Sequence, residues 1–323
     1  MRKLAEFVRK YALAVLAPAA LILLLLLVSP QTRSWGAVIS LLKQSFAPAI
    51  LGWGVLYGMQ AGNWDFSLGG RIVLVAILGG NIASSAHLGV VGFVVLCMVF
   101  SMICAILVGG AYWVLKIPTM IASIGIMLIF ESLTRIIYNG AGTHLDQSMM
   151  ILGKWPYNFI VFLAAFALAS VLSYKRKFGY AVRAVGINAT VAKTNGIDPM
   201  KTKAIAIVYS GIFVGIYAIL NTSISGVASA VAGTMGSMAT VFDAMMCVLI
   251  GMAIAGKGSV VFAVYSGAII TQLLKMGMTA VGLPTTFNKV VIAVFVVAFM
   301  VSSSRRDLID RFVRRVHRQR KAA

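Results

Sequence analysis

The segment GMQAGNWDFSLGGR at residues 58–71 interrupts a long apolar part of the chain. It carries four glycines and an acidic residue, Asp65, between apolar runs at 41–59 and 68–86. Runs of about 20 apolar residues cross a hydrocarbon core of roughly 30 Å. An aspartate near the centre of a span costs about 2.5–3.5 kcal/mol, and broken backbone at that depth is tolerated only inside protein or beside a cavity. The segment therefore predicts a membrane fold with a specialised helix break.

The rest of the chain repeats the apolar pattern on both sides of this break. Of the 323 residues, 60% are hydrophobic and 11% are charged, whereas about 25% are charged in soluble domains. The sequence predicts an all-α polytopic membrane protein with about ten transmembrane helices in a single domain, residues 1–323. The expected spans lie near residues 11–28, 41–59, 68–86, 90–115, 118–138, 157–174, 204–222, 239–256, 259–280 and 287–303.

The basic residues decide the expected orientation. The net charge is +20, and the lysines and arginines gather in short segments between the spans rather than on one surface that would suit nucleic acid. With the N-terminus inside, 21 of them lie on the cytoplasmic side, including those of the tail at 304–323, and five lie on the other side. Cytoplasmic loops carry this excess, so the sequence predicts a bacterial inner-membrane protein with both termini in the cytoplasm. The first apolar run exceeds the core of a cleaved signal peptide, so we expect it to be retained as a span.

Residue types that carry catalysis or bind metals are scattered along the chain. The segment GMAIAGKGS at 251–259 nearly spells a phosphate-binding loop, but Gly258 stands where a hydroxyl must reach magnesium. The histidines lack ligand spacing, and the three cysteines lie inside apolar runs without a C-x-x-C pair. The sequence therefore predicts no cofactor, no metal and no catalytic residue.

A second interrupted segment, NTSISGVASAVAGTMGSMATVFDA, covers residues 221–244. It is also rich in small and polar residues and ends on an acid. The first break follows a span that runs inward and the second follows one that runs outward, as in an inverted repeat that relates spans 2–5 to spans 7–10. Paired breaks in two halves indicate a transport pathway at their interface. The residues expected near that pathway are Asn63, Trp64, Asp65, Phe66, Ser67, Asn221, Ser223 and Ser225.

The role of Asp65 stays open at this point, because its carboxylate either meets a polar solute or caps the helix that follows. Trp64 and Phe66 have two interpretations as well, since such rings stack on sugars or pack against other apolar groups. Glu131 and Arg135 are spaced four residues apart, so we expect them to neutralise one another.

The longest expected internal loop, residues 175–203, reads KRKFGYAVRAVGINATVAKTNGIDPMKTK. Its apolar spacing predicts a short helix from about Tyr180 to Thr194. Gly196 supplies a helix stop and Asp198-Pro199 a turn. Composition alone fits equally well an ordinary basic loop that fixes topology and contacts lipid headgroups.

Four motifs, in order, carry a resemblance over essentially the whole chain. They are NWDFSLGG at 63–70, IPTMIASIGIMLIFESL at 117–133, FGYAVRAVGINATVAKTNGI at 178–197 and FDAMMCVLIGMAIAGKGS at 242–259. The sequence resembles the permeases of ribose-type ABC sugar importers, a branch that includes relatives for other sugars and for nucleosides. It departs from the family pattern at Tyr180, Ile187, Met252 and Lys257, among other positions.

The resemblance implies a permease that works as a pair of identical or related chains. It also implies ABC ATPase subunits in the cytoplasm, which hydrolyse ATP, and an extracytoplasmic solute-binding protein. Loop 175–203 is then the expected docking site for the ATPase. The residues expected to act there are Tyr180, Val182, Arg183, Val185, Gly186, Asn188, Ala189, Lys193 and Gly196.

The function expected from these observations is import of a small polar solute, most simply a monosaccharide. A nucleoside is the alternative solute, and an ion-gradient-driven secondary transporter is the alternative class of transporter. An integral-membrane enzyme is a third reading, and it would require conversion of a substrate by the isolated chain.

Overall fold

The computed structural model describes residues 14–16, 18–23, 35–255 and 258–280, together with residues 282, 284, 287, 290 and 294. Most of the expected first and tenth spans and the whole basic tail at 304–323 lie outside the described residues, as does Lys257 of the 251–259 segment.

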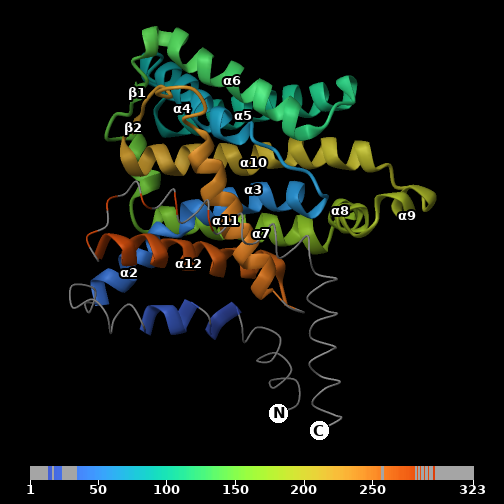
Figure 1. The fold of residues 1–323 in the computed structure, drawn as a ribbon. Coiled ribbons are helices and arrows are strands. Elements are labelled where there is room, and N and C mark those ends of the chain that lie inside the picture. The colour runs from blue at the N-terminus through green and yellow to red at the C-terminus, as the bar shows by residue number, and fades with distance from the viewer. Residues whose placement is uncertain are drawn as a thin grey trace.

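The described residues fold almost entirely into helices (Figure 1). The α-helices are α2 (Trp35–Gln44), α3 (Phe46–Gln60), α4 (Leu68–Ser85), α5 (Gly89–Leu115), α6 (Thr119–Ile136), α7 (Tyr157–Tyr174), α8 (Lys177–Ile187), α9 (Ala189–Thr194), α10 (Pro199–Ser225), α11 (Met238–Ile254) and α12 (Val260–Ala280). The shorter elements are the 3₁₀ helices η2 (Ile137–Gly140) and η3 (Met149–Gly153) and the strands β1 (Thr143–His144) and β2 (Val227–Ala228).

Among the described residues, seven helical segments are long and apolar enough to cross a membrane, and α11 falls just short of that length. They are Gly36–Gln60, Leu68–Ser85, Gly89–Leu115, Thr119–Gly140, Tyr157–Tyr174, Pro199–Ser225 and Val260–Ala280. Together with α11 they match the expected spans 2–9, although α2 and α3 are continuous and α10 begins five residues earlier than expected. The prediction of an all-α multi-pass membrane protein is therefore confirmed.

The long helices lie side by side, with α3 and α10 in the middle of the bundle (Figure 1). Figure 1 also places α8 and α9 at one end of the bundle and the strands at the other. The strands pair antiparallel, with Thr143 opposite Ala228, and so join the segment after α6 to the one after α10. The two longest connections thus lie at opposite ends of the spans, as the topology predicts.

Helix α3 is buried on nearly all sides, which explains why its apolar residues show no single face. Two polar tips fix its position. The indole nitrogen of Trp53 donates a hydrogen bond to the Val261 carbonyl at 2.9 Å, and the Tyr57 hydroxyl donates to the Ala169 carbonyl at 3.0 Å. Buried aromatic side chains with a satisfied polar tip hold neighbouring elements in one register. Helix α3 is therefore a fixed support for the break that follows it.

The single helix expected from Tyr180 to Thr194 is wrong, because the structure divides it at Asn188. Helix α8 ends there and α9 begins one residue later. Asn188 has extended backbone angles, and its side-chain oxygen accepts hydrogen bonds from the Thr190 and Val191 amides at 3.0 Å. Asparagine favours this helix-starting role because its side chain competes with the continuing helical hydrogen bonds.

Candidate functional site

The break between α3 and α4 begins with a left-handed turn at the end of α3. Gly62 has a φ of +69°, which glycine adopts without the steric penalty of a side chain. The Asn63 amide then donates back to the Gly58 carbonyl at 2.8 Å and closes the turn. The chain is thereby redirected into the protein instead of continuing the helix.

Asp65 and Arg71 form a buried ion pair at the start of α4. Oδ2 of Asp65 lies 2.7 Å from Nη2 of Arg71, and the side chains are 7% and 0% exposed. Oδ1 of Asp65 accepts hydrogen bonds from the Ser67 amide at 2.9 Å and from the Ser67 hydroxyl at 2.5 Å. The two opposite charges compensate each other, as a buried pair requires, although Nε and Nη1 of Arg71 have no hydrogen-bond partner in the part of the chain that the structure describes. In this conformation the carboxylate holds the beginning of α4 in place.

The break lies deep in the bundle. Nη2 of Arg71 also donates to the Ser210 hydroxyl at 3.1 Å, and Ser210 lies eleven residues along α10, about 16 Å from its beginning at 1.5 Å per residue. On the other side, the Phe66 amide donates to the Ser123 hydroxyl of α6 at 3.1 Å. Irregular backbone at this depth is tolerated because protein surrounds it.

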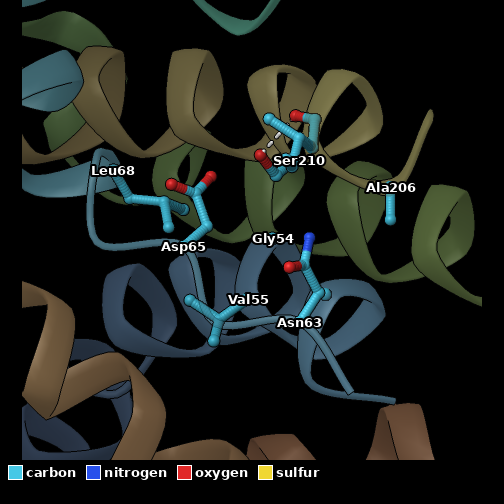
Figure 2. A pocket seen from close by; sticks show the side chains of 9 residues that line it. Gly54, Val55, Asn63, Asp65, Leu68, Ala206 and Ser210 are labelled. Atoms are coloured by element: carbon cyan, nitrogen blue, oxygen red, sulfur yellow. Dashed lines mark hydrogen bonds between the residues drawn. The ribbon is translucent and has the colours of Figure 1, made fainter. Parts of the chain in front are cut away.

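A small cavity lies between the break and helices α3 and α10 (Figure 2). Its volume is about 10 Å³, close to the room that one water molecule needs. It is lined by Gly54, Val55, Gly58, Asn63, Asp65, Leu68, Ala206, Ile207 and Ser210. The amide oxygen and nitrogen of Asn63 have no hydrogen-bond partner among the described residues. The site is polar, but it is too small for a sugar in this conformation.

The structure does not bring the two expected groups of pathway residues together. Asn221, Ser223 and Ser225 lie eleven or more residues beyond Ser210 on α10, about 16 Å or more along its axis. The Ser223 hydroxyl donates to the Met149 carbonyl of η3 at 3.3 Å, and the Ser225 hydroxyl donates to the Val227 carbonyl at 2.8 Å. Asn221 is exposed. Trp64 is half-buried, whereas Phe66 is buried.

The two breaks meet instead through the beginning of α11. A Cβ atom on Gly69 would lie 2.5 Å from the Ser237 carbonyl oxygen, so only glycine permits the close approach of α4 to this segment. The Phe66 ring lies edge-on to the Phe242 ring with a centroid distance of 6.0 Å. The connection after α10 therefore returns into the bundle and ends beside the first break.

The expected pairing of Glu131 with Arg135 is wrong, because each side chain holds the connection between α10 and α11. The Glu131 carboxylate accepts from the Met235 amide at 2.8 Å and from the Ser237 amide and hydroxyl at 2.9 and 2.6 Å. The Arg135 guanidinium donates to the Val231 carbonyl at 2.8 Å and to the Gly233 carbonyl. Free backbone groups in a re-entrant loop offer these charges more hydrogen bonds than the two side chains offer each other.

Loop 175–203 lies against the end of α3, where the first break begins. A Cβ atom on Gly186 of α8 would overlap the Gln60 carbonyl oxygen. Val182 and Val185 are 0% and 3% exposed, so the expectation that they present an apolar face to a partner is wrong. They pack inside the chain because they anchor α8 to the bundle. Of the residues expected to contact the ATPase, Arg183 is half-buried and the others besides the two valines are exposed, namely Tyr180, Gly186, Asn188, Ala189, Lys193 and Gly196. The neighbouring Ile187 and Val191 are exposed as well.

Residues 37–300 match the family described as "Branched-chain amino acid transport system / permease component". The chain belongs to this family of transport permeases.

Curated relatives cover most of this permease. It is 25% identical over 288 residues to the galactose/methyl galactoside import permease protein MglC of Salmonella typhimurium, which covers 80% of this chain and 84% of the relative. It is 26% identical over 293 residues to the galactofuranose transporter permease protein YtfT of Escherichia coli, covering 85% and 81%. It is 23% identical over 314 residues to the ribose import permease protein RbsC of Escherichia coli, covering 91% and 94%. The resemblance to ribose-type ABC sugar permeases is therefore confirmed.

Sequence reasoning missed three groups that shape this permease. Arg71 stood in the quoted segment without a role, although it is six residues from Asp65 and inside an apolar run. Ser210 gave no signal, because serines are common in membrane helices. Asp243 and Lys275 lie 32 residues apart in sequence and form the second ion pair of the described residues. Their separation left no local spacing that pairs them.

Proposed function

We propose that this chain is the membrane-spanning subunit of an ATP-driven importer and carries a small polyhydroxylated solute, a monosaccharide, across a bacterial inner membrane. The observation that carries the proposal is the meeting of two helix breaks inside one bundle, at Gly69 and Ser237. Transporters place discontinuous helices of this kind beside the solute pathway. The family description supports a permease, and the relatives named for galactose, galactofuranose and ribose support a sugar as the solute.

The proposed pathway is bordered by the eight polar and aromatic residues of the two breaks. The Asn63 amide has no hydrogen-bond partner within the described ranges, Trp64 is half-buried, and Asn221 and Ser225 are exposed. These groups suit a sugar, which needs hydrogen bonds and an aromatic face. Asp65 and Ser67 contribute by holding the break, because their hydrogen bonds are made within the chain. Phe66 and Ser223 contribute by packing against α11 and η3.

The proposed assembly contains a second permease chain, cytoplasmic ABC ATPase subunits and an extracytoplasmic solute-binding protein. Loop 175–203 is the proposed ATPase docking site, with the N- and C-termini on the same cytoplasmic side. Ile187, Val191 and Tyr180 are 87%, 54% and 59% exposed and offer the apolar contacts. Because α8 abuts Gln60, movement of the loop reaches the first break directly. We also propose that the chain has about ten transmembrane spans and that an inverted repeat relates spans 2–5 to spans 7–10.

Reconstitution in vesicles with the ATPase and the binding protein tests the transport class. We expect monosaccharide uptake that requires ATP and is insensitive to ionophores that collapse ion gradients. Uptake that survives without ATP and stops when the gradient collapses would establish the secondary transporter instead. A cysteine at the exposed Ala189 should crosslink to the ATPase, and a cysteine at the exposed Lys154, in the connection at the other end of the bundle, is the matched control.

A further inference from the structure

The second ion pair joins two helices in a setting unlike that of the first. Nζ of Lys275 on α12 contacts Oδ2 of Asp243 on α11, and the two side chains are 27% and 31% exposed. Asp243 lies five residues inside the start of α11 and Lys275 five residues before the end of α12, about 7.5 Å along each helix. Both charges are therefore set back from the helix ends.

The position of α11 places this pair at depth. Ser237, at the start of α11, lies against Gly69 near the beginning of α4, and Arg71 two residues further on bonds Ser210 in the middle of α10. A charge that is partly exposed at membrane depth faces water or protein, since exposure to hydrocarbon is costly. The surface around this pair is therefore in contact with water or protein and not with lipid.

The partly exposed face of α12 around Lys275 carries three polar residues, with the half-buried Met276 and Met278 beside them. Gln272, Lys275 and Thr279 follow one another at helical spacing, so they lie on one side of the helix. Gln272 donates to the Gln44 carbonyl at 3.2 Å, and Thr279 donates to the Lys275 carbonyl at 3.0 Å. The outward residues of α5 form a contrast, since Val91, Val95, Val99, Ile103, Ile106 and Leu107 are all apolar and 47–75% exposed. Such a face suits lipid, and that of α12 suits water.

We propose that Lys275 lines the aqueous path of the solute and donates hydrogen bonds to its hydroxyl groups, with Asp243 as its positioning residue. An ammonium group has three donors, and one of them is used by Asp243. The neighbouring Phe242 touches Phe66 of the first break, so a shift of that break is transmitted to the pair. The inference rests on the proposed importer function. It assigns a solute contact to Lys275, which lies outside the two interrupted segments at 58–71 and 221–244.

The first test measures what surrounds the α12 face. A nitroxide label is placed at Gln272 or Thr279 in the full chain assembled with its ATPase in vesicles. The wild-type chain serves as the labelling blank, because Cys97, Cys104 and Cys247 are buried. We expect collisions with water-soluble nickel complexes to exceed collisions with oxygen, and the reverse for control labels at Val95 and Ile103. Oxygen-dominated relaxation at 272 and 279, or low access to both reagents, would overturn the proposal.

The second test measures transport with the charge removed. Lys275→Met should lower the maximal rate of ATP-driven uptake several-fold, Lys275→Arg should retain part of it, and ATP hydrolysis should continue in both. Lys154→Met, which removes an exposed lysine outside the spans, is the matched control. Unchanged uptake by Lys275→Met would overturn the assignment. If the wild-type chain shows no ATP-dependent uptake, the importer proposal fails, while the label accessibility still decides whether this face meets water.

Discussion

The described residues contain two acid–base pairs in the membrane-spanning helices, and the two pairs have nearly the same chemistry and opposite surroundings. Asp65 and Arg71 are six residues apart, buried, and bonded to two serines as well as to each other. Asp243 and Lys275 join two helices across 32 residues of sequence, and about three tenths of each side chain is exposed. The first pair lies inside the bundle and stabilises a helix break. The second pair lies at a partly exposed surface that carries polar residues.

The difference shows that the role of a charged residue within a membrane protein depends on how exposed its side chain is, and not on its presence alone. A fully buried pair stabilises a conformation only while both partners remain, because removal of one leaves an uncompensated charge. A partly exposed pair contributes less to stability than a buried one, since water screens it. In the part of the chain that the structure describes, Lys275 bonds only to Asp243 through its side chain, so its other donors are available to a solute.

The largest expected effect follows removal of the buried cation. Arg71→Met should destabilise the protein by about 3–5 kcal/mol, because Asp65 stays buried without its partner. Thermal unfolding in detergent measures the loss. The double variant Asp65→Asn with Arg71→Met should recover part of it, since no charge then remains. A midpoint for Arg71→Met equal to that of the wild type would show that the pair does not hold the break.

Glu131 extends the comparison to a buried carboxylate that is held by backbone amides. Glu131→Gln should weaken the hydrogen bonds to Met235 and Ser237, at a cost of about 1.5–3 kcal/mol. Hydrogen–deuterium exchange of these two amides should become faster. Ser132→Ala, which changes the neighbouring exposed residue, is the control and should leave the exchange as it is. If the two amides exchange as slowly in Glu131→Gln as in the wild type, the Glu131 carboxylate does not hold this connection.

A change at Gly186 disturbs the first break from outside. Gly186→Ala should force α8 away from Gln60, because its Cβ atom would overlap that carbonyl, and overpacking costs about 1–3 kcal/mol. Solute-stimulated ATP hydrolysis by the assembled complex should fall. Gly110→Ala in α5 is the matched control, since nothing lies within 4 Å of its added methyl group. Equal stimulation in the two variants would contradict a mechanical link between the loop and the break.

The smallest expected change in stability belongs to the partly exposed pair of Asp243 and Lys275. Lys275→Met should shift the free energy of unfolding by no more than about 1 kcal/mol. Thermal unfolding beside Lys154→Met measures this shift. A loss as large as that of Arg71→Met would place the second pair in the same structural role as the first.

The sequence predicted most of the fold because length and apolar composition alone identify membrane helices. Spans 2–9 lie close to their expected places, and the break at 61–67 was found from its glycines and Asp65. The contacts of that break were not predictable. Whether Asp65 met a solute or capped α4 depended on Arg71 and Ser67, and their orientation follows from the turn at Gly62.

Predictions from helical spacing were wrong at two places, because such spacing considers one helix without its neighbours. Glu131 and Arg135 have ideal spacing for a pair, yet the returning connection before α11 offers both of them backbone partners. Val182 and Val185 form an apolar stripe that suits a partner protein, yet the bundle itself covers them. Both outcomes depend on segments distant in sequence, as does the pairing of Asp243 with Lys275.

The most direct test measures stability and uptake together for Arg71→Met and Lys275→Met in one reconstituted preparation. The account predicts a crossed result. Arg71→Met lowers the unfolding midpoint strongly, whereas Lys275→Met keeps the midpoint of the wild type and loses most of its ATP-driven monosaccharide uptake. A stable Arg71→Met protein, or a Lys275→Met protein that transports as the wild type does, would contradict the division of roles between the two pairs.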